Sequence, residues 1–281
     1  MKRRDFLSVS AASLWLADVA VLLGADVKTS WKIGICDWDL RATGQPNSFA
    51  VAKELGYEGV QVSYLPRGAE TLADKAVRRK FLAAADEAGV AIASFCIGTM
   101  NEIPFATTPE AEDWVKNCLD AMEEMKIDRV LIPFFGNADM EKLKDQQPLA
   151  LEKFKRLAPI AEKKKKVLAI ESYLSAEDHL KMIDAVGSDA VKVYYDVRNS
   201  KNKGYDIYRE MELLGSKKLI SEIHFKDNTR LGAGDIDFTK VCTTLEKIGY
   251  EGWVVVESST SGNWRESQAA NAQFIKKLLG R

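Results

Sequence analysis

The sequence is poor in the residues that most often build structural metal sites or covalent cross-links. Its 281 residues include only two histidines and four cysteines. No two cysteines stand at the Cys-x-x-Cys spacing of a zinc site, and Cys36 and Cys96 fall inside apolar, strand-like runs. We therefore interpret the cysteines as small buried hydrophobic residues rather than as zinc ligands or a disulfide framework.

The chain also lacks an excess of either charge and a long apolar segment. Its 40 basic and 41 acidic residues leave a formal net charge of −1. No global field then favours nucleic acid or an anionic membrane, and we expect no nucleic-acid partner. The apolar stretch at residues 9–23 is interrupted by Asp18 and is too short to span a membrane, so we expect no membrane span.

The N-terminus differs in kind from the rest of the chain. A basic head with paired Arg3 and Arg4 precedes Phe6 and Leu7 and the short apolar stretch, which is typical of an export signal and resembles a twin-arginine signal. We predict that residues 1–28 form such a signal, that the protein is exported to the periplasm, and that residues 29–281 form the folded domain. A frayed amphipathic helix on a cytoplasmic protein is the alternative.

From Trp31 onward, short β-branched apolar runs alternate with longer amphipathic runs. Strands that alternate with helices are typical of parallel βαβ units, and eight units in about 250 residues match a TIM barrel. The first strand is followed by no glycine-rich phosphate loop, which argues against an open nucleotide-binding sheet. We predict a single α/β domain, a (β/α)₈ barrel, with strands at 32–36, 59–63, 91–97, 129–134, 167–171, 191–196, 220–225 and 252–257, and helices at about 48–55, 72–88, 109–125, 147–164, 176–185, 204–215, 238–248 and 264–279.

Four consecutive predicted strands carry, at or near their ends, a side chain that can bind a metal: Glu171, Asp196, His224 and Glu257. Because the chemistry of TIM barrels lies at the C-terminal ends of the strands, we expect the four to converge. Three carboxylates in one place repel one another unless protons or a cation neutralise them, and a neighbouring imidazole favours a metal. Three oxygen ligands and one nitrogen suit a single Mn²⁺, Mg²⁺ or Co²⁺ ion better than structural zinc.

These residues, together with the segments 224–227, 230–238 and 248–253, resemble the xylose-isomerase-like TIM barrels over about residues 31–280. That group includes ketose 3-epimerases, hydroxypyruvate isomerases, inositol-pathway enzymes, xylose isomerases and endonuclease IV. The resemblance implies that Glu171, Asp196, His224 and Glu257 hold one divalent metal ion. It also implies that Glu171 and Glu257 flank the substrate carbon and exchange its proton.

The resemblance further implies residues that bind the substrate. Arg230 follows His224 by six residues and matches an arginine that contacts substrate oxygens, and Lys226 belongs to the same motif. Glu177 follows Glu171 by six residues, where epimerases carry a substrate-binding glutamate. We also assign Trp38, at the end of the first strand, and Asn199 to the substrate site, as a sugar-facing ring and a hydrogen-bonding amide.

Two of these positions have competing interpretations. Ser175 followed by Asp178 predicts a capping box, which makes Glu177 a residue of a helix first turn, and we favour that interpretation. Asn199 stands where ketose epimerases carry a substrate-binding histidine, which argues against 3-epimerisation of free ketoses. The absence of any histidine before His179 argues against xylose isomerase, and two histidines are too few for the metal cluster of endonuclease IV.

Three functions are compatible with this sequence. We predict a metal-dependent isomerase or epimerase of a sugar or sugar derivative, in which the two glutamates transfer a proton next to a carbonyl. A metal-dependent lyase or hydratase on keto-sugars or keto-glycosides is the second, and the predicted export favours it. A non-catalytic carbohydrate-binding barrel is the third, although no metal ligand is lost. The expected partner is a small sugar, and assembly into a homo-oligomer stays open.

Overall fold

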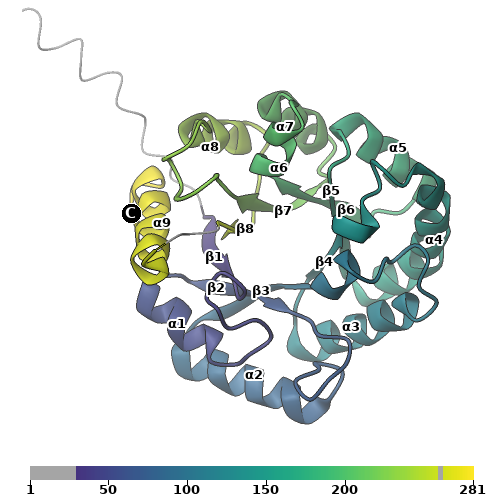
Figure 1. Cartoon of the computed structure of the whole chain (residues 1–281), viewed down its shortest axis with the longest axis horizontal. Helices are drawn as coiled ribbons and strands as arrows, with labels where there is room; N and C mark the ends of the chain where they lie inside the picture. Colours follow the sequence, from purple (N-terminus) through teal and green to yellow (C-terminus); the bar gives the residue numbers. More distant parts are fainter. Residues whose placement is uncertain (1–29, 259–261) are drawn as a thin grey trace, which may run out of the picture.

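The structure is a computed structural model that describes residues 30–258 and 262–281 (Figure 1). Eight parallel strands close into a barrel in the order of the sequence, β1 to β8, and β8 pairs with β1. The helices surround the barrel, which confirms the predicted (β/α)₈ fold. The predicted signal at residues 1–28 lies outside the described residues.

The strands begin and end close to the predicted positions. They are β1 (Lys32–Cys36), β2 (Gly59–Ser63), β3 (Ala91–Cys96), β4 (Arg129–Phe134), β5 (Val167–Ser172), β6 (Val191–Asp196), β7 (Ile220–Phe225) and β8 (Trp253–Val256). Five of the eight match the prediction, whereas β3 is one residue shorter, β5 is one residue longer and β8 lacks both predicted end residues. Glu257 therefore lies just after β8, and its N–H still donates to the carbonyl of Phe225, 3.1 Å away.

The helices follow the predicted pattern, with one addition. They are α1 (Ser48–Leu55), α2 (Lys75–Ala88), α3 (Ala111–Met125), α4 (Gln147–Lys164), α5 (Ala176–Val186), α6 (Val197–Asn202), α7 (Ile207–Ser216), α8 (Phe238–Lys247) and α9 (Trp264–Leu278). Aspartate caps set two of the starts later than predicted. Asp74 accepts the N–H of Ala76 before α2, and Asp206 accepts the N–H groups of Tyr208 and Arg209 before α7.

The additional helix α6 follows β6 directly and was absent from the sequence prediction. Six residues are too few to show a helical period. The helix begins because the Asp196 side chain accepts the N–H groups of Arg198 and Asn199, both at 2.8 Å. Asp196 thus ends strand β6 and caps helix α6 through Oδ1, and its second carboxylate oxygen, Oδ2, takes no part in the cap.

The core has two parts because side chains alternate between the two faces of each strand. Outward-facing apolar side chains pack against the helices and form the main core, with Ile33, Val60 and Phe95 among them. A smaller cluster contains Cys96, Leu131, Ala169 and Tyr194. The remaining buried strand residues include polar ones: Gln61, Ser94, Glu222 and His224 are all fully buried.

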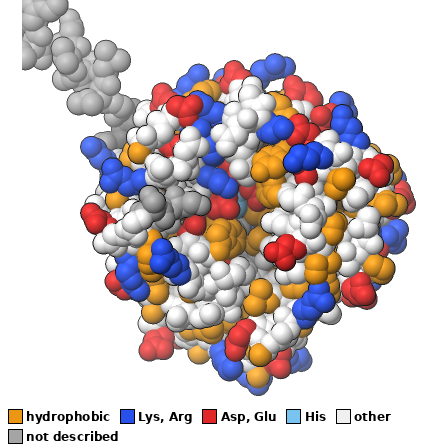
Figure 2. Space-filling model, in the orientation of Figure 1, with side chains coloured by type: hydrophobic (Ala, Val, Ile, Leu, Met, Phe, Trp, Pro, Cys, Tyr) orange, Lys and Arg blue, Asp and Glu red, His pale blue; other side chains and the backbone are white. Residues whose placement is uncertain are grey.

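No helix of the described part of the chain is both long and apolar enough to cross a membrane. On the face seen in Figure 2, basic and acidic side chains are interspersed rather than gathered into one large patch of either sign. This distribution agrees with the balanced composition of the chain.

His179 on α5 makes the folded state sensitive to acid. Its Nε2 lies 2.9 Å from Ser172 Oγ and its Nδ1 lies 3.1 Å from the Ser175 carbonyl. Burial lowers the pKa of His179 to about 4, although the bond to Ser175 opposes this shift. The unfolded chain, with a histidine pKa of about 6.5, therefore binds an extra proton between the two values. The contribution of the buried, neutral His179 to the stability of the folded state is present above about pH 6.5 and is lost as the pH falls towards 4.

We expect this loss to reach about 3 kcal/mol by pH 4. His179→Gln keeps a hydrogen-bonding side chain but cannot gain the proton, so the pH dependence of its unfolding free energy should be weaker over this interval. Urea unfolding of both proteins at a series of pH values measures the difference. Parallel curves for the two proteins would show that His179 does not titrate on unfolding.

Candidate metal centre

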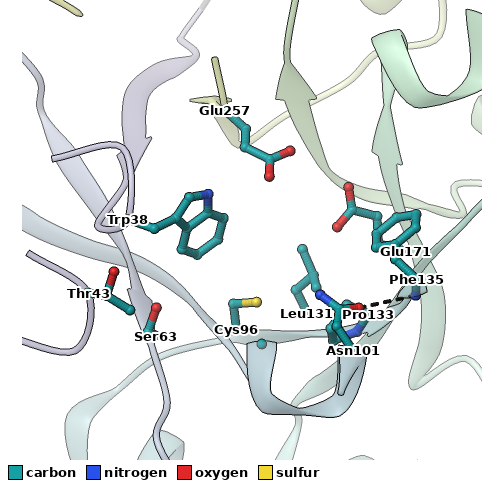
Figure 3. Close-up of a pocket in the computed structure, with 11 residues that line it drawn as sticks. Trp38, Thr43, Ser63, Cys96, Asn101, Leu131, Pro133, Phe135, Glu171 and Glu257 are labelled. Carbon is teal, nitrogen blue, oxygen red and sulfur yellow. Dashed lines mark hydrogen bonds between the residues drawn. The ribbon is translucent and has the colours of Figure 1, made fainter. Parts of the chain in front are cut away.

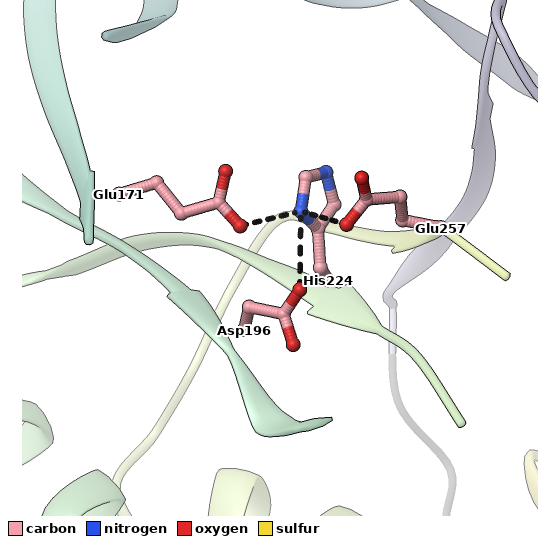
Figure 4. A group of neighbouring side chains, drawn as sticks. All are labelled: Glu171, Asp196, His224 and Glu257. Carbon is pink, nitrogen blue, oxygen red and sulfur yellow. Dashed lines mark hydrogen bonds and ion pairs between the residues drawn. The ribbon is translucent and has the colours of Figure 1, made fainter. Parts of the chain in front are cut away.

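The barrel brings the four predicted metal ligands together (Figure 4). One ligand atom from each of Glu171, Asp196, His224 and Glu257 lies within 4.8 Å of the other three, so the group could hold a metal ion. His224 Nδ1 lies 3.1 Å from Glu171 Oε1, 3.4 Å from Glu257 Oε2 and 3.9 Å from Asp196 Oδ2. Strand register explains part of this arrangement, because Asp196 and His224 are direct partners in the β6–β7 pair.

The burial of these groups makes their charges strongly interdependent. Glu171, Asp196 and His224 are buried, and the Glu257 side chain is 21% exposed. Burial, together with the nearby carboxylates of Glu257 and Glu171, raises the pKa of Asp196 to about 7, although Lys226 opposes this shift. Burial opposes the charge of His224, yet the three carboxylates raise its pKa to about 9. Without a metal, protons and cationic side chains must balance the carboxylates.

Lys226 is the second cationic side chain at this cluster. Its Nζ lies 2.7 Å from Glu257 Oε2 and 3.4 Å from Asp196 Oδ2. Burial raises the pKa of Glu257, but His224 and Lys226 outweigh it and bring that pKa down to about 2. Lys226 therefore lies beside the predicted metal ligands, and its contact with a substrate remains a prediction.

The residues present fit a hard divalent cation. Asp196 uses Oδ1 to cap α6. Within the described part of the chain its buried Oδ2 accepts no hydrogen bond, and Lys226 Nζ, 3.4 Å away, forms only an ion pair with it. A buried carboxylate oxygen without a hydrogen-bond donor is unusual and needs an explanation. Three carboxylates and one imidazole form a donor set that suits Mn²⁺, Mg²⁺ or Co²⁺, and a cation there would complete the interactions of Oδ2.

A cavity of about 280 Å³ adjoins the cluster, and Glu171 and Glu257 contribute to its lining (Figure 3). Trp38 lies on one side, with its ring edge-on to His224 at 6.4 Å between centroids. Phe135 lies on another side, and its N–H donates to Asn101 Oδ1 at 3.1 Å. The cavity volume lies at the small end of the range for ligand pockets. Its lining combines aromatic rings with carboxylates and an amide, which suits a small sugar. Trp38 thus lines the cavity, and its contact with a substrate remains a prediction.

The other predicted substrate residues do not line this cavity. Asn199 is buried on α6, and Arg230 is exposed on the loop between β7 and α8. Glu177 lies on the exposed surface of α5, 3.3 Å from Arg209. In the same helix, Ser175 Oγ accepts the Asp178 N–H at 3.2 Å, as the capping interpretation requires. Substrate contacts of Asn199, Arg230 and Glu177 remain predictions.

The loop that carries Arg230 is fastened at both ends to Asp227. This buried carboxylate accepts the N–H of Asn228 at 2.9 Å and that of Gly234 at 3.1 Å, and it also accepts a hydrogen bond from the Arg198 guanidinium. A Cβ at position 234 would lie 1.9 Å from Asp227 Oδ1, so only glycine fits. The Asp and Gly of the sequence motif therefore fix the loop rather than contact the cavity.

Three polar residues near the site were absent from the sequence prediction. Thr43 and Ser63 line the cavity, and Gln61 contacts His224 from within the barrel. Gln61 had a visible signal, because it is the polar residue at the centre of the apolar strand Gly59–Ser63. Thr43 had no comparable signal, since it lies in a loop whose path depends on the folded barrel.

The comparisons with known proteins agree with this architecture. The profile of the xylose isomerase-like TIM barrel family matches residues 49–278. A search of curated protein sequences finds no match. Similar solved structures include a 3-keto-D-glucoside 4-epimerase from E. coli, with a TM-score of 0.74, 16% identity and coverage of 89% of this chain and 100% of that chain.

Two further structures show the same fold. A D-allulose 3-epimerase from Methylomonas sp. has a TM-score of 0.70 and 15% identity, with coverage of 89% of this chain and 98% of that one. A xylose isomerase domain protein from Planctomyces limnophilus has a TM-score of 0.71 and 18% identity, with coverage of 88% and 96% respectively. With the closed eight-stranded barrel and a family match over most of its length, this chain belongs to the xylose isomerase-like TIM barrel family.

Proposed function

We propose that this protein is a divalent-metal-dependent isomerase or epimerase of a sugar or sugar derivative. One observation carries the proposal: Glu171 and Glu257 belong to the cluster that could hold a metal and also line the adjoining cavity. A substrate in the cavity would therefore meet two carboxylates, one from β5 and one from just after β8. The similar structures named as sugar epimerases support this choice of chemistry.

The roles of the side chains follow from their positions. A divalent ion held by Glu171, Asp196, His224 and Glu257 would supply Lewis-acid stabilisation for negative charge on substrate oxygens. One glutamate removes the proton from a carbon next to the carbonyl, and the other returns a proton. Return to the opposite face of the same carbon inverts it, whereas return to the neighbouring carbon isomerises the sugar.

Other residues of the site would bind and orient the sugar. Trp38 and Phe135 offer ring surfaces to its C–H groups, and Asn101 lines the cavity with a polar side chain. Lys226, beside Glu257, would donate a hydrogen bond to a substrate oxygen. Positioning of this kind is a large part of catalysis, because it removes the entropic cost of bringing the reacting groups together.

A lyase or hydratase acting on a keto-glycoside is the second candidate, and Lys226 is the observation that favours it. An ammonium group 2.7 Å from Glu257 would neutralise an oxygen that leaves after proton removal. The reaction would break the bond between carbon and that oxygen, with the proton taken by a glutamate and a double bond formed beside the ketone. Export, predicted from residues outside the described part, would also suit a glycoside substrate.

Product analysis separates these functions. The full chain, loaded with Mn²⁺, would be incubated in D₂O with a panel of keto-sugars and 3-keto-glycosides, and the products analysed by mass spectrometry and NMR. We expect an isomer or epimer of unchanged composition that carries deuterium from the solvent at the reacting carbon. A released fragment or a change by one water would establish the second candidate. Sugar binding without turnover of any substrate would leave a binding barrel and contradict the proposal.

A further inference from the structure

We propose that Asp37, which directly follows β1, is a positioning residue that holds one wall of the substrate cavity in place. This wall, the β1–β2 wall, consists of Trp38, Thr43 and Ser63, which line the cavity and lie on the same side of it (Figure 3). The inference rests on the proposed function, because it concerns the cavity in which the sugar would bind.

The Asp37 side chain joins two segments that carry residues of the β1–β2 wall. Its Oδ2 accepts the N–H of Gly44 at 2.9 Å and the N–H of Ser63 at 2.7 Å. Its Oδ1 accepts the hydroxyl of Ser63 at 2.7 Å. Because Gly44 directly follows Thr43, one carboxylate fixes the backbone next to Thr43 and both the backbone and the side chain of Ser63.

The main chain of Asp37 fixes the third residue of the wall, Trp38. The Asp37 carbonyl accepts the N–H groups of Leu40 and Ala42, both at 3.1 Å, and these bonds close the turn that contains Trp38. The Asp37 N–H donates to the carbonyl of Gln61 on β2 at 3.0 Å. The turn is therefore closed on itself and joined to the neighbouring strand at the same residue.

Gly44 has the backbone conformation that this arrangement requires. Its φ is 63°, in the left-handed region that favours glycine. A side chain there would also press on Leu65, since a Cβ at position 44 would lie 2.7 Å from Leu65 Cδ1. Glycine thus lets the chain turn back at this point and direct its N–H at the Asp37 carboxylate.

Asp37 acts on the wall without reaching a substrate. Its side chain is fully buried, and both of its carboxylate oxygens accept hydrogen bonds from the protein. Donors of this kind offset the cost of burying a carboxylate. Burial raises the pKa of Asp37 to about 6, although the bonds from Ser63 and Gly44 oppose this shift. The carboxylate is therefore ionised at about pH 8 and can accept all three bonds.

Loss of this carboxylate should affect the sugar rather than the metal. Without it the N–H groups of Gly44 and Ser63 lose their acceptor, and the β1–β2 wall is no longer held at a fixed distance from the opposite side of the cavity. A wall that contacts the sugar throughout the reaction contributes equally to ground-state and transition-state binding, so its loss raises KM and leaves kcat nearly unchanged. The metal ligands lie on or directly after β5 to β8, away from these bonds.

The test compares Asp37→Ala with Asp37→Asn in the full chain, loaded with Mn²⁺, at about pH 8. An asparagine can accept both N–H groups with its oxygen and donate to the Ser63 hydroxyl with its NH₂ group, so it keeps the three bonds and removes the charge. Glu210→Ala is the matched control. Glu210 is a buried carboxylate that accepts the Ala176 N–H and the Tyr195 hydroxyl, both at 2.8 Å, and none of these residues lines the cavity.

We expect Asp37→Ala to raise KM about 10-fold or more for the substrate found by product analysis, with kcat within about 3-fold of the wild type. Asp37→Asn should keep the wild-type KM, and both variants should keep the wild-type affinity for Mn²⁺ in calorimetric titration. Glu210→Ala should lower Tm and leave KM unchanged. Asp37→Ser, which retains one short acceptor, should also raise KM and replaces Asp37→Ala if that variant does not fold.

Three results would overturn the inference. The first is a wild-type KM in Asp37→Ala, and the second is an equal rise of KM in Asp37→Asn, which would assign the effect to the charge rather than to the bonds. The third is a loss of Mn²⁺ affinity in Asp37→Ala that accounts for its loss of activity, which would place the effect at the metal.

Hydrogen exchange followed by mass spectrometry tests the same bonds without any sugar. The amides of residues 38–44 and 61–64 should exchange about 10–100-fold faster in Asp37→Ala than in the wild type, and at the wild-type rate in Asp37→Asn. If no sugar were turned over, the proposed function would fail, and unchanged exchange in Asp37→Ala would still refute the role of Asp37. If turnover were found with a wild-type KM in Asp37→Ala, only the role of Asp37 would be refuted.

Discussion

Glu257→Gln is expected to lower turnover by at least about 10³-fold, and Glu171→Gln by a similar factor, with the metal at saturating concentration. A glutamine cannot accept the substrate proton, and loss of general acid–base catalysis alone typically costs about 10²–10⁴-fold. Each substitution also removes one negative charge from the cluster around His224. Initial rates on the substrate found by product analysis measure the effect, and the fold is checked by melting.

The matched control for these variants is Glu212→Gln. Glu212 lies on the surface of the barrel, 2.8 Å from Lys247, with its side chain 45% exposed. Its loss should leave turnover unchanged. Metal titration of each site variant shows whether the lost activity follows lost metal or lost proton transfer. If the double variant with both Glu171 and Glu257 replaced kept its activity, the two-carboxylate mechanism would be wrong.

His224→Ala is expected to abolish the thermal stabilisation of the protein by metal. A ligand that binds only the folded chain at 100 times its Kd adds about 2.7 kcal/mol, which corresponds to a rise in Tm of about 5–10 °C for a domain of this size. The variant loses the only nitrogen ligand and leaves three carboxylates without their central partner. Melting with Mn²⁺ and with a chelator measures the shift.

The other histidine provides the control for this experiment. His179→Gln alters α5 and not the cluster, so its metal-dependent rise in Tm should equal that of the wild type. In the absence of metal, His224→Ala should also melt below the wild type, because His224 balances the charges of Glu171 and Glu257. An undiminished shift in His224→Ala would place the stabilising metal elsewhere.

The barrel and the ligand cluster were predictable because each depends on a repeated local pattern. Buried parallel strands form short β-branched runs, and barrel closure places their C-terminal ends at one mouth. The ends of four such runs therefore specified Glu171, Asp196, His224 and Glu257 without any knowledge of side-chain contacts. Their convergence within 4.8 Å follows from strand order and register.

The missed features depend on contacts between distant parts of the chain. Gln61 and His224 are separated by 163 residues, and only barrel closure brings them together. Helix α6 exists because of a cap at Asp196 and is too short to have a period. Arg230 and Glu177 were assigned through the family resemblance, by their spacing from His224 and Glu171. Spacing specifies neither the course of a loop nor the side of a helix that faces the cavity.

The most direct test of the metal site is a crystal structure of the full chain grown with Mn²⁺, with anomalous diffraction data. We expect one strong anomalous peak per chain, contacted by His224 Nδ1 and by carboxylate oxygens of Glu171, Asp196 and Glu257, with Gln61 Oε1 still within hydrogen-bond distance of His224 Nε2. A peak bound through Nε2, a peak at another place, or no peak at all beside four unchanged side chains would contradict it.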